Sequence, residues 1–149
     1  MSKHPEGLRT IERQLRMHDL RVAKLRPWLD QILAMLHRCK ESGPFVKSLD
    51  GTPAQATLEY ERDALEQEIR AHEILITLGR DQHALEVLDE VAGDASLAHT
   101  VAANPRAFAE ARGIHLPKNL DVTVTILGER ARIRLDYFDR ACSASLTFP

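Results

Sequence analysis

A run of apolar residues spaced alternately three and four apart dominates the first third of the chain. It comprises Leu8, Ile11, Leu15, Val22, Leu25, Leu29, Ile32 and Leu36, and only His18 interrupts it. This spacing places the side chains on one face of a helix, which must bury that face against another element. The pattern predicts one long helix from about Thr10 to Lys40. Pro27 is expected to kink this helix without ending it, because the apolar register continues across the proline.

A second long helix is predicted from Pro53 to Leu78, with Thr52 as its N-cap and Gly79 as its C-terminal stop. Its apolar face contains Leu58, Leu65, Ile69, His72 and Ile76. We expect the two helices to pair as an antiparallel hairpin over residues 1–79. Folding about the loop would bring Leu36 near Leu58 and Leu25 near Ile69.

Shorter elements are predicted over residues 80–149. Asp81 and Asp94 are expected to cap helices that end near Ala92 and Ala103. A further helix is bounded by Asn104 as its cap, Pro105 at its first position and Gly113 just past its end.

A β-hairpin is predicted around the dipeptide Gly128-Glu129, which suits a type II′ turn. Pairing outward from this turn sets Val124 opposite Ile133 on an apolar face and Thr123 opposite Arg134 on a polar face. A third strand is expected from Leu146 to Phe148. The whole pattern predicts an α+β fold in which residues 1–79 and 80–149 form one compact unit.

Charge is unevenly distributed along the 149 residues, although the net charge is only −2. Residues 1–40 carry a net +5, residues 41–100 a net −9 and residues 101–149 a net +2. This pattern favours attraction between the two long helices over nucleic-acid binding, because the acidic segment would oppose a phosphate backbone. The chain shows no secretory signal and no apolar run of membrane-spanning length, and it has only two cysteines, so we expect a cytoplasmic protein.

His18 and His72 are the main candidates for chemistry, because the antiparallel register places them within roughly two helical turns of each other. Facing histidines in a helical bundle can bind a metal, usually beside carboxylates. No Glu-x-x-His spacing supplies further ligands, so hydrogen-bonded histidines are favoured and no metal or other cofactor is expected. The sequence also lacks a nucleophile elbow and a glycine-rich phosphate loop, which makes an enzyme the minority interpretation.

Arg130, Arg132 and Arg134 are predicted to lie together on the polar face of the β-hairpin. They could bind carboxylates or phosphates of a partner. The favoured alternative is that they keep an exposed sheet face soluble.

Residues 94–124 resemble the nitrile-hydratase-type leader module. The resemblance rests on Asn104-Pro105-Arg106-Ala107 at a helix start, on Gly113-Ile114-His115-Leu116-Pro117, and on the strand Val122-Thr123-Val124. This module occurs in the α subunit of nitrile hydratase and in leaders of ribosomally made, enzymatically modified peptides. Hydratase activity is not implied, because Cys39 and Cys142 cannot form the tight cysteine cluster of that metal site.

The resemblance implies a non-catalytic, leader-like protein or precursor that a peptide-modifying enzyme recognises. The expected docking surface contains Ile114, Leu116, Val122 and Val124 together with the three arginines. In a precursor, the tail residues that an enzyme could modify are Cys142, Ser143, Ser145 and Thr147. The alternatives are a small metal-binding or enzymatic helical protein that uses His18 and His72, and a structural homo-oligomeric scaffold.

Self-association is predicted because the long helices carry more apolar residues than one hairpin seam can bury. The additional residues are Leu20, Trp28, Leu33, Met35, Ile74 and Leu75. An uncovered apolar patch of several hundred Å² is unusual on a monomer, and twofold dimers are the commonest oligomers. We therefore expect a homodimer formed through the long helices.

Overall fold

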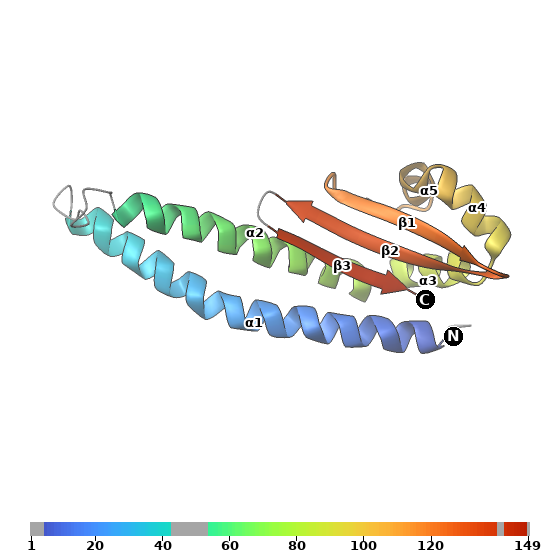
Figure 1. Cartoon of the computed structure of the whole chain (residues 1–149), viewed down its shortest axis with the longest axis horizontal. Coiled ribbons are helices and arrows are strands. Elements are labelled where there is room, and N and C mark those ends of the chain that lie inside the picture. The colour runs from blue at the N-terminus through green and yellow to red at the C-terminus, as the bar shows by residue number, and fades with distance from the viewer. Residues whose placement is uncertain (1–4, 43–53, 140–141, 149) are drawn as a thin grey trace.

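A computed structural model describes residues 5–42, 54–139 and 142–148 of the chain. Within these ranges it contains the helices α1 (Pro5–Ser42), α2 (Ala54–Arg80), α3 (Gln82–Ala92), α4 (Ala95–Ala103) and α5 (Pro105–Ala111). The strands β1 (Leu120–Leu127), β2 (Arg130–Asp139) and β3 (Cys142–Phe148) follow. The predicted α+β fold is confirmed (Figure 1). No helix in these ranges is long and apolar enough to cross a lipid bilayer.

The helices α1 and α2 form the predicted antiparallel hairpin (Figure 1). Its seam buries Val22, Leu25, Ile32 and Leu36 of α1 against Leu65 and Ile69 of α2. The helix α1 runs without interruption through Pro27 and curves along its length, so the proline does not divide it. It begins at Pro5 rather than near Thr10, because Gly7 lies against the ring of Phe148 and gives the first turn a tertiary contact.

Gly79 does not end the second helix, contrary to the prediction, since α2 continues to Arg80. Gly79 is buried where the two long helices approach closely, and a Cβ added there would lie 2.6 Å from Cδ2 of Leu15. The glycine therefore makes room for a neighbouring side chain instead of supplying a C-cap. The predicted cap Thr52 and first residue Pro53 lie outside the described residues.

The three short helices begin at the predicted caps. The Asp81 carboxylate accepts hydrogen bonds from the backbone N–H groups of His83 and Ala84. Asp94 accepts from Leu97, and the Asn104 side chain accepts from Ala107, with Pro105 in the first turn of α5. Gly113 has the positive φ of +75° that is common just past a helix end.

The strands form one antiparallel sheet in the order β1-β2-β3. The register of β1 on β2 is the predicted one, with Val124 opposite Ile133 and Leu127 opposite Arg130. Gly128 at the turn has φ +67°, as the first central residue of a type II′ turn requires. The third strand is longer than predicted, because pairing with β2 extends it from Leu146 back to Cys142.

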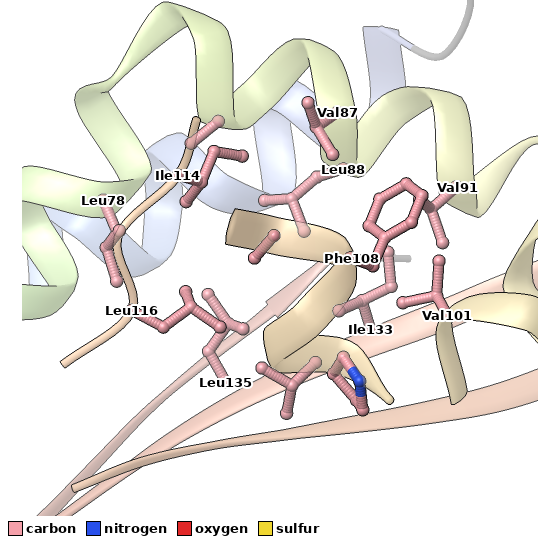
Figure 2. A pocket seen from close by; sticks show the side chains of 14 residues that line it. Leu78, Val87, Leu88, Val91, Val101, Phe108, Ile114, Leu116, Ile133 and Leu135 are labelled. Atoms are coloured by element: carbon pink, nitrogen blue, oxygen red, sulfur yellow. The ribbon is translucent and has the colours of Figure 1, made fainter. Parts of the chain in front are cut away.

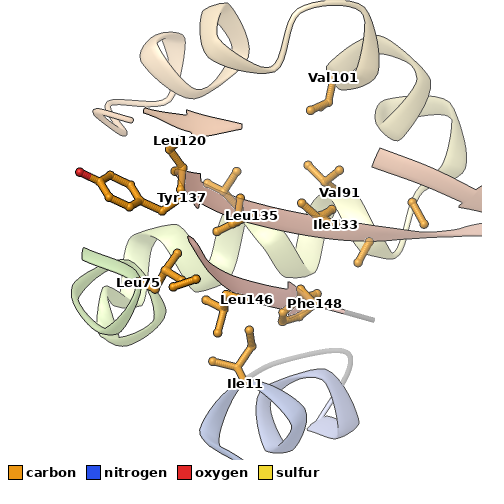
Figure 3. Close-up of a cluster of buried hydrophobic side chains, with 14 of the residues drawn as sticks. Ile11, Leu75, Val91, Val101, Leu120, Ile133, Leu135, Tyr137, Leu146 and Phe148 are labelled. Atoms are coloured by element: carbon orange, nitrogen blue, oxygen red, sulfur yellow. The ribbon is translucent and has the colours of Figure 1, made fainter. Parts of the chain in front are cut away.

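One core joins the helical hairpin to the sheet (Figure 3). Ile11, Leu15 and Leu75 of the hairpin pack in the same cluster as Leu120 and Phe148 of the sheet. Residues 1–79 and 80–149 therefore share a hydrophobic core. Leu75 is completely buried in it, so this residue does not belong to an uncovered patch as predicted.

Candidate functional site

The residues predicted to form a docking surface occupy both faces of the sheet. The side chains of Val122 and Val124 point to the inner face, where they pack against the core together with Ile114 and Leu116. Arg130, Arg132 and Arg134 are exposed on the outer face. The structure therefore separates the apolar residues from the arginines, and the edge of β1 is the line along which the two faces meet.

Arg106 holds the segment that leads into β1. Its guanidinium donates hydrogen bonds to the carbonyl oxygens of Leu116, Pro117, Lys118 and Leu120, at distances of 3.2, 2.8, 3.0 and 2.7 Å. One side chain of α5 thus fixes the backbone of residues 116–120, which lead into β1. Sequence reasoning noted Arg106 only as part of a motif, because its role depends on carbonyl groups that the sequence does not place.

An apolar cavity of about 60 Å³ lies between this segment, the helices α3, α4 and α5, and the inner face of the sheet (Figure 2). Phe108 of α5, Ile114 and Leu116 of the segment, and Val122 and Ile133 of the sheet are among its walls. All fourteen lining residues are apolar, so the cavity offers no acid, base or nucleophile. It can receive a hydrocarbon group.

The outer edge of β1 has unpaired backbone groups. The N–H of Leu120 bonds to the carbonyl of Pro117 and its carbonyl accepts from Arg106, so both groups point away from β2. The N–H and C=O groups of successive residues in an antiparallel strand point alternately toward and away from the neighbouring strand. Those of Val122, Val124 and Ile126 therefore also point away from β2. Among the described residues these three have no hydrogen-bond partner for either group.

The opposite edge of the sheet is covered by side chains of α1. The Gln14 amide accepts from the N–H of Thr147 and donates to its carbonyl, both at 2.6 Å. His18 Nε2 lies 2.9 Å from the carbonyl oxygen of Ser145. An exposed strand edge invites pairing with another chain. Here side chains of α1 bind three outward backbone groups of β3, whereas the outward groups of Val122, Val124 and Ile126 in β1 have no such partner among the described residues.

His18 and His72 lie closer together than the sequence predicted, with their Nδ1 atoms 2.7 Å apart. Since a carbonyl can only accept, His18 Nε2 carries a proton, and in neutral His18 its Nδ1 accepts from the Nδ1–H of His72. Burial lowers the pKa of His72, and the neighbouring His18 lowers it further, whereas Glu68 opposes both. The described residues contain no group of three or more His, Cys, Asp or Glu that could hold a metal ion.

The other predicted site residues have structural surroundings of their own. Arg134 Nε donates to Asp136 Oδ1 at 2.9 Å, so part of the arginine charge is balanced within the sheet. Ser143, Ser145 and Thr147 belong to β3 and pair with β2 instead of forming a free tail. Cys142 is in the same strand, but its side chain lies outside the described residues.

Comparison of this chain with protein-family models, with curated proteins and with solved structures finds no match.

Proposed function

We propose that this protein is a non-catalytic, leader-like binding protein of the cytoplasm, and that it pairs with a peptide-modifying enzyme through the outer edge of β1. The observation that carries the proposal is the difference between the two edges of the sheet. Gln14 and His18 bind outward backbone groups at the β3 edge, whereas the outward N–H and C=O groups of Val122 and Val124 at the β1 edge have no partner among the described residues. Strand addition at such an edge is a common mode of peptide recognition.

Two features beside the edge support docking there. Arg106 fixes the segment before β1, so the edge is held in place before a partner arrives. The apolar cavity adjoins Val122 on the inner face, where a hydrocarbon side chain of a partner could be buried. The resemblance of residues 94–124 to a leader module suggests the class of partner, a cyclodehydratase, lanthionine synthetase or radical enzyme encoded by a neighbouring gene.

Amide hydrogen exchange measured by NMR tests the proposal residue by residue. The N–H groups of Thr123 and Thr125 face β2 and should exchange slowly in the free protein, whereas those of Val122 and Val124 should exchange quickly. Adding the enzyme encoded beside the gene should leave Thr123 and Thr125 unchanged and slow exchange at the outward amides of the β1 edge, including Val122 and Val124. Enzyme binding without protection at these two amides would contradict docking at this edge.

A matched pair of variants provides an independent test. Val124→Pro removes the outward N–H without removing a β1–β2 hydrogen bond, and proline is tolerated on an edge strand. We expect it to weaken enzyme binding at least tenfold. Thr125→Ala changes an exposed side chain on the same strand and should leave the affinity unchanged, with circular dichroism used to check that both variants fold.

A further inference from the structure

The helix α1 has a second line of residues with the spacing of a helix–helix seam, on the side away from α2. Its successive members are spaced by 4, 3, 4, 4, 3 and 4 residues, and they are Arg13, Met17, Leu20, Lys24, Trp28, Gln31 and Met35. Its apolar members are exposed, with Met17 at 67%, Leu20 at 65%, Trp28 at 51% and Met35 at 37% of their full accessible surface. We call these seven residues the outer seam.

The outer seam combines apolar and cationic groups. Arg13 and Lys24 form no ion pair with any described residue, whereas Arg21 and Arg26, which reach toward α2, pair with Glu68 and Glu73 of that helix. A partner for the seam must therefore bury apolar side chains and also accommodate at least one ammonium group. An aromatic face satisfies both requirements, because its π electrons attract a cation over an apolar surface.

The part of the outer seam from Met17 to Met35 is complementary to itself when a second copy runs antiparallel. With a twofold axis near Arg26, Met17 lies opposite the partner's Met35, and Leu20 lies opposite the partner's Gln31. At the centre, Lys24 lies opposite the partner's Trp28, and the contact occurs twice by symmetry. We infer that the outer seam joins two copies of this chain into a twofold dimer, in which each Lys24 ammonium rests on the Trp28 ring of the partner subunit.

This arrangement accounts for the cation in the middle of an apolar line. A leucine at residue 24 would give a more apolar seam, but the lysine fixes the antiparallel register because only one alignment brings it to the tryptophan. The inference is independent of docking at β1, since it uses α1 alone.

Sedimentation over a concentration series tests the dimer with the full chain. The mass should rise from 16.8 kDa toward twice that value as concentration increases. Lys24→Ala and Trp28→Ala should each raise the dimer dissociation constant about tenfold, because each removes both copies of the central contact. Tyr60→Ala is the matched control, since Tyr60 is an exposed aromatic residue on α2, outside the seam. A mass of 16.8 kDa at every concentration would overturn the inference.

Disulfide trapping tests the register in a Cys142→Ser background. A mixture of Met17→Cys and Met35→Cys proteins should cross-link to each other, and neither protein should cross-link to itself. Cross-linking within either single variant would contradict the antiparallel alignment. The fluorescence of Trp28, the single tryptophan of the chain, reports whether the protein binds anionic vesicles. Binding of monomers through Trp28 would show that a membrane surface is the partner of the outer seam, and it would overturn the dimer.

Discussion

Replacing Gln14 with leucine should destabilise the protein by opening the β3 edge. The Gln14 amide forms two hydrogen bonds with the backbone of Thr147, besides a local one to the Thr10 carbonyl within α1, and the two that reach the sheet disappear in Gln14→Leu. A typical intramolecular hydrogen bond contributes about 0.5–1.5 kcal/mol net, so the expected loss in unfolding free energy is about 1–3 kcal/mol. For a chain of this length that loss corresponds to a decrease of roughly 3–10 °C in Tm.

Urea unfolding followed by circular dichroism measures this loss, and the slope against urea should not change. Gln67→Leu is the control, because Gln67 is a half-buried glutamine of α2 that makes no hydrogen bond with the described residues. It should change the unfolding free energy by less than about 0.5 kcal/mol. If the two variants lose equal stability, the amide of Gln14 does not support the edge.

A second substitution at the same residue separates the two hydrogen bonds. Gln14→Glu keeps an acceptor for the Thr147 N–H, but it places a carboxylate against the Thr147 carbonyl. The variant should be less stable than the wild type at pH 7. Part of the difference should disappear below about pH 4.3, where a protonated carboxyl group can donate to that carbonyl. A difference that does not depend on pH would contradict this explanation.

Two further predictions concern other side chains. Arg106→Lys should lower the unfolding free energy by about 2 kcal/mol or more, because an ammonium group cannot reach the four carbonyl oxygens to which the guanidinium donates. Urea unfolding measures this loss. An unchanged unfolding free energy would show that other contacts hold the segment before β1. His72 should make stability depend on pH. Its pKa in the folded state is lowered, so the unfolded chain binds more protons, and stability should be unaffected above pH 6.5 and fall as pH decreases from 6.5 toward the folded-state pKa. His72→Gln should be less sensitive to pH in that window, and equal sensitivity would assign the effect to other groups.

The elements of the fold were predictable from local patterns. The register of β1 on β2 follows from a two-residue turn and from the alternation of Val124 and Thr125, since a slip of one residue would reverse both faces. The caps Asp81 and Asn104 were predictable because capping uses backbone groups only a few residues away.

The contacts that define the candidate site could not be predicted in the same way. Gln14 and Thr147 are 133 residues apart in sequence, and nothing near either residue indicates the other. Gly79 resembles a helix stop, although its actual role is set by Leu15 on another helix. The register of the two long helices was enough to predict that His18 and His72 lie within two helical turns. Their direct hydrogen bond was not predictable, because the Ser145 carbonyl in the sheet sets which nitrogen of His18 carries the proton.

The difference between the two sheet edges also limits how molecules of this protein can aggregate. Fibrous growth through strands requires each molecule to receive a strand at one edge and to offer one at the other. Among the described residues, α1 lies against the β3 edge and binds it through Gln14 and His18, so α1 obstructs strand pairing there and leaves the β1 edge for it. One added strand, from any source, therefore ends the sheet, and a fibre cannot propagate through it. We expect the double variant Gln14→Leu/His18→Leu to weaken this stop and to form fibres at concentrations at which the wild type stays dispersed, which light scattering and dye binding would detect.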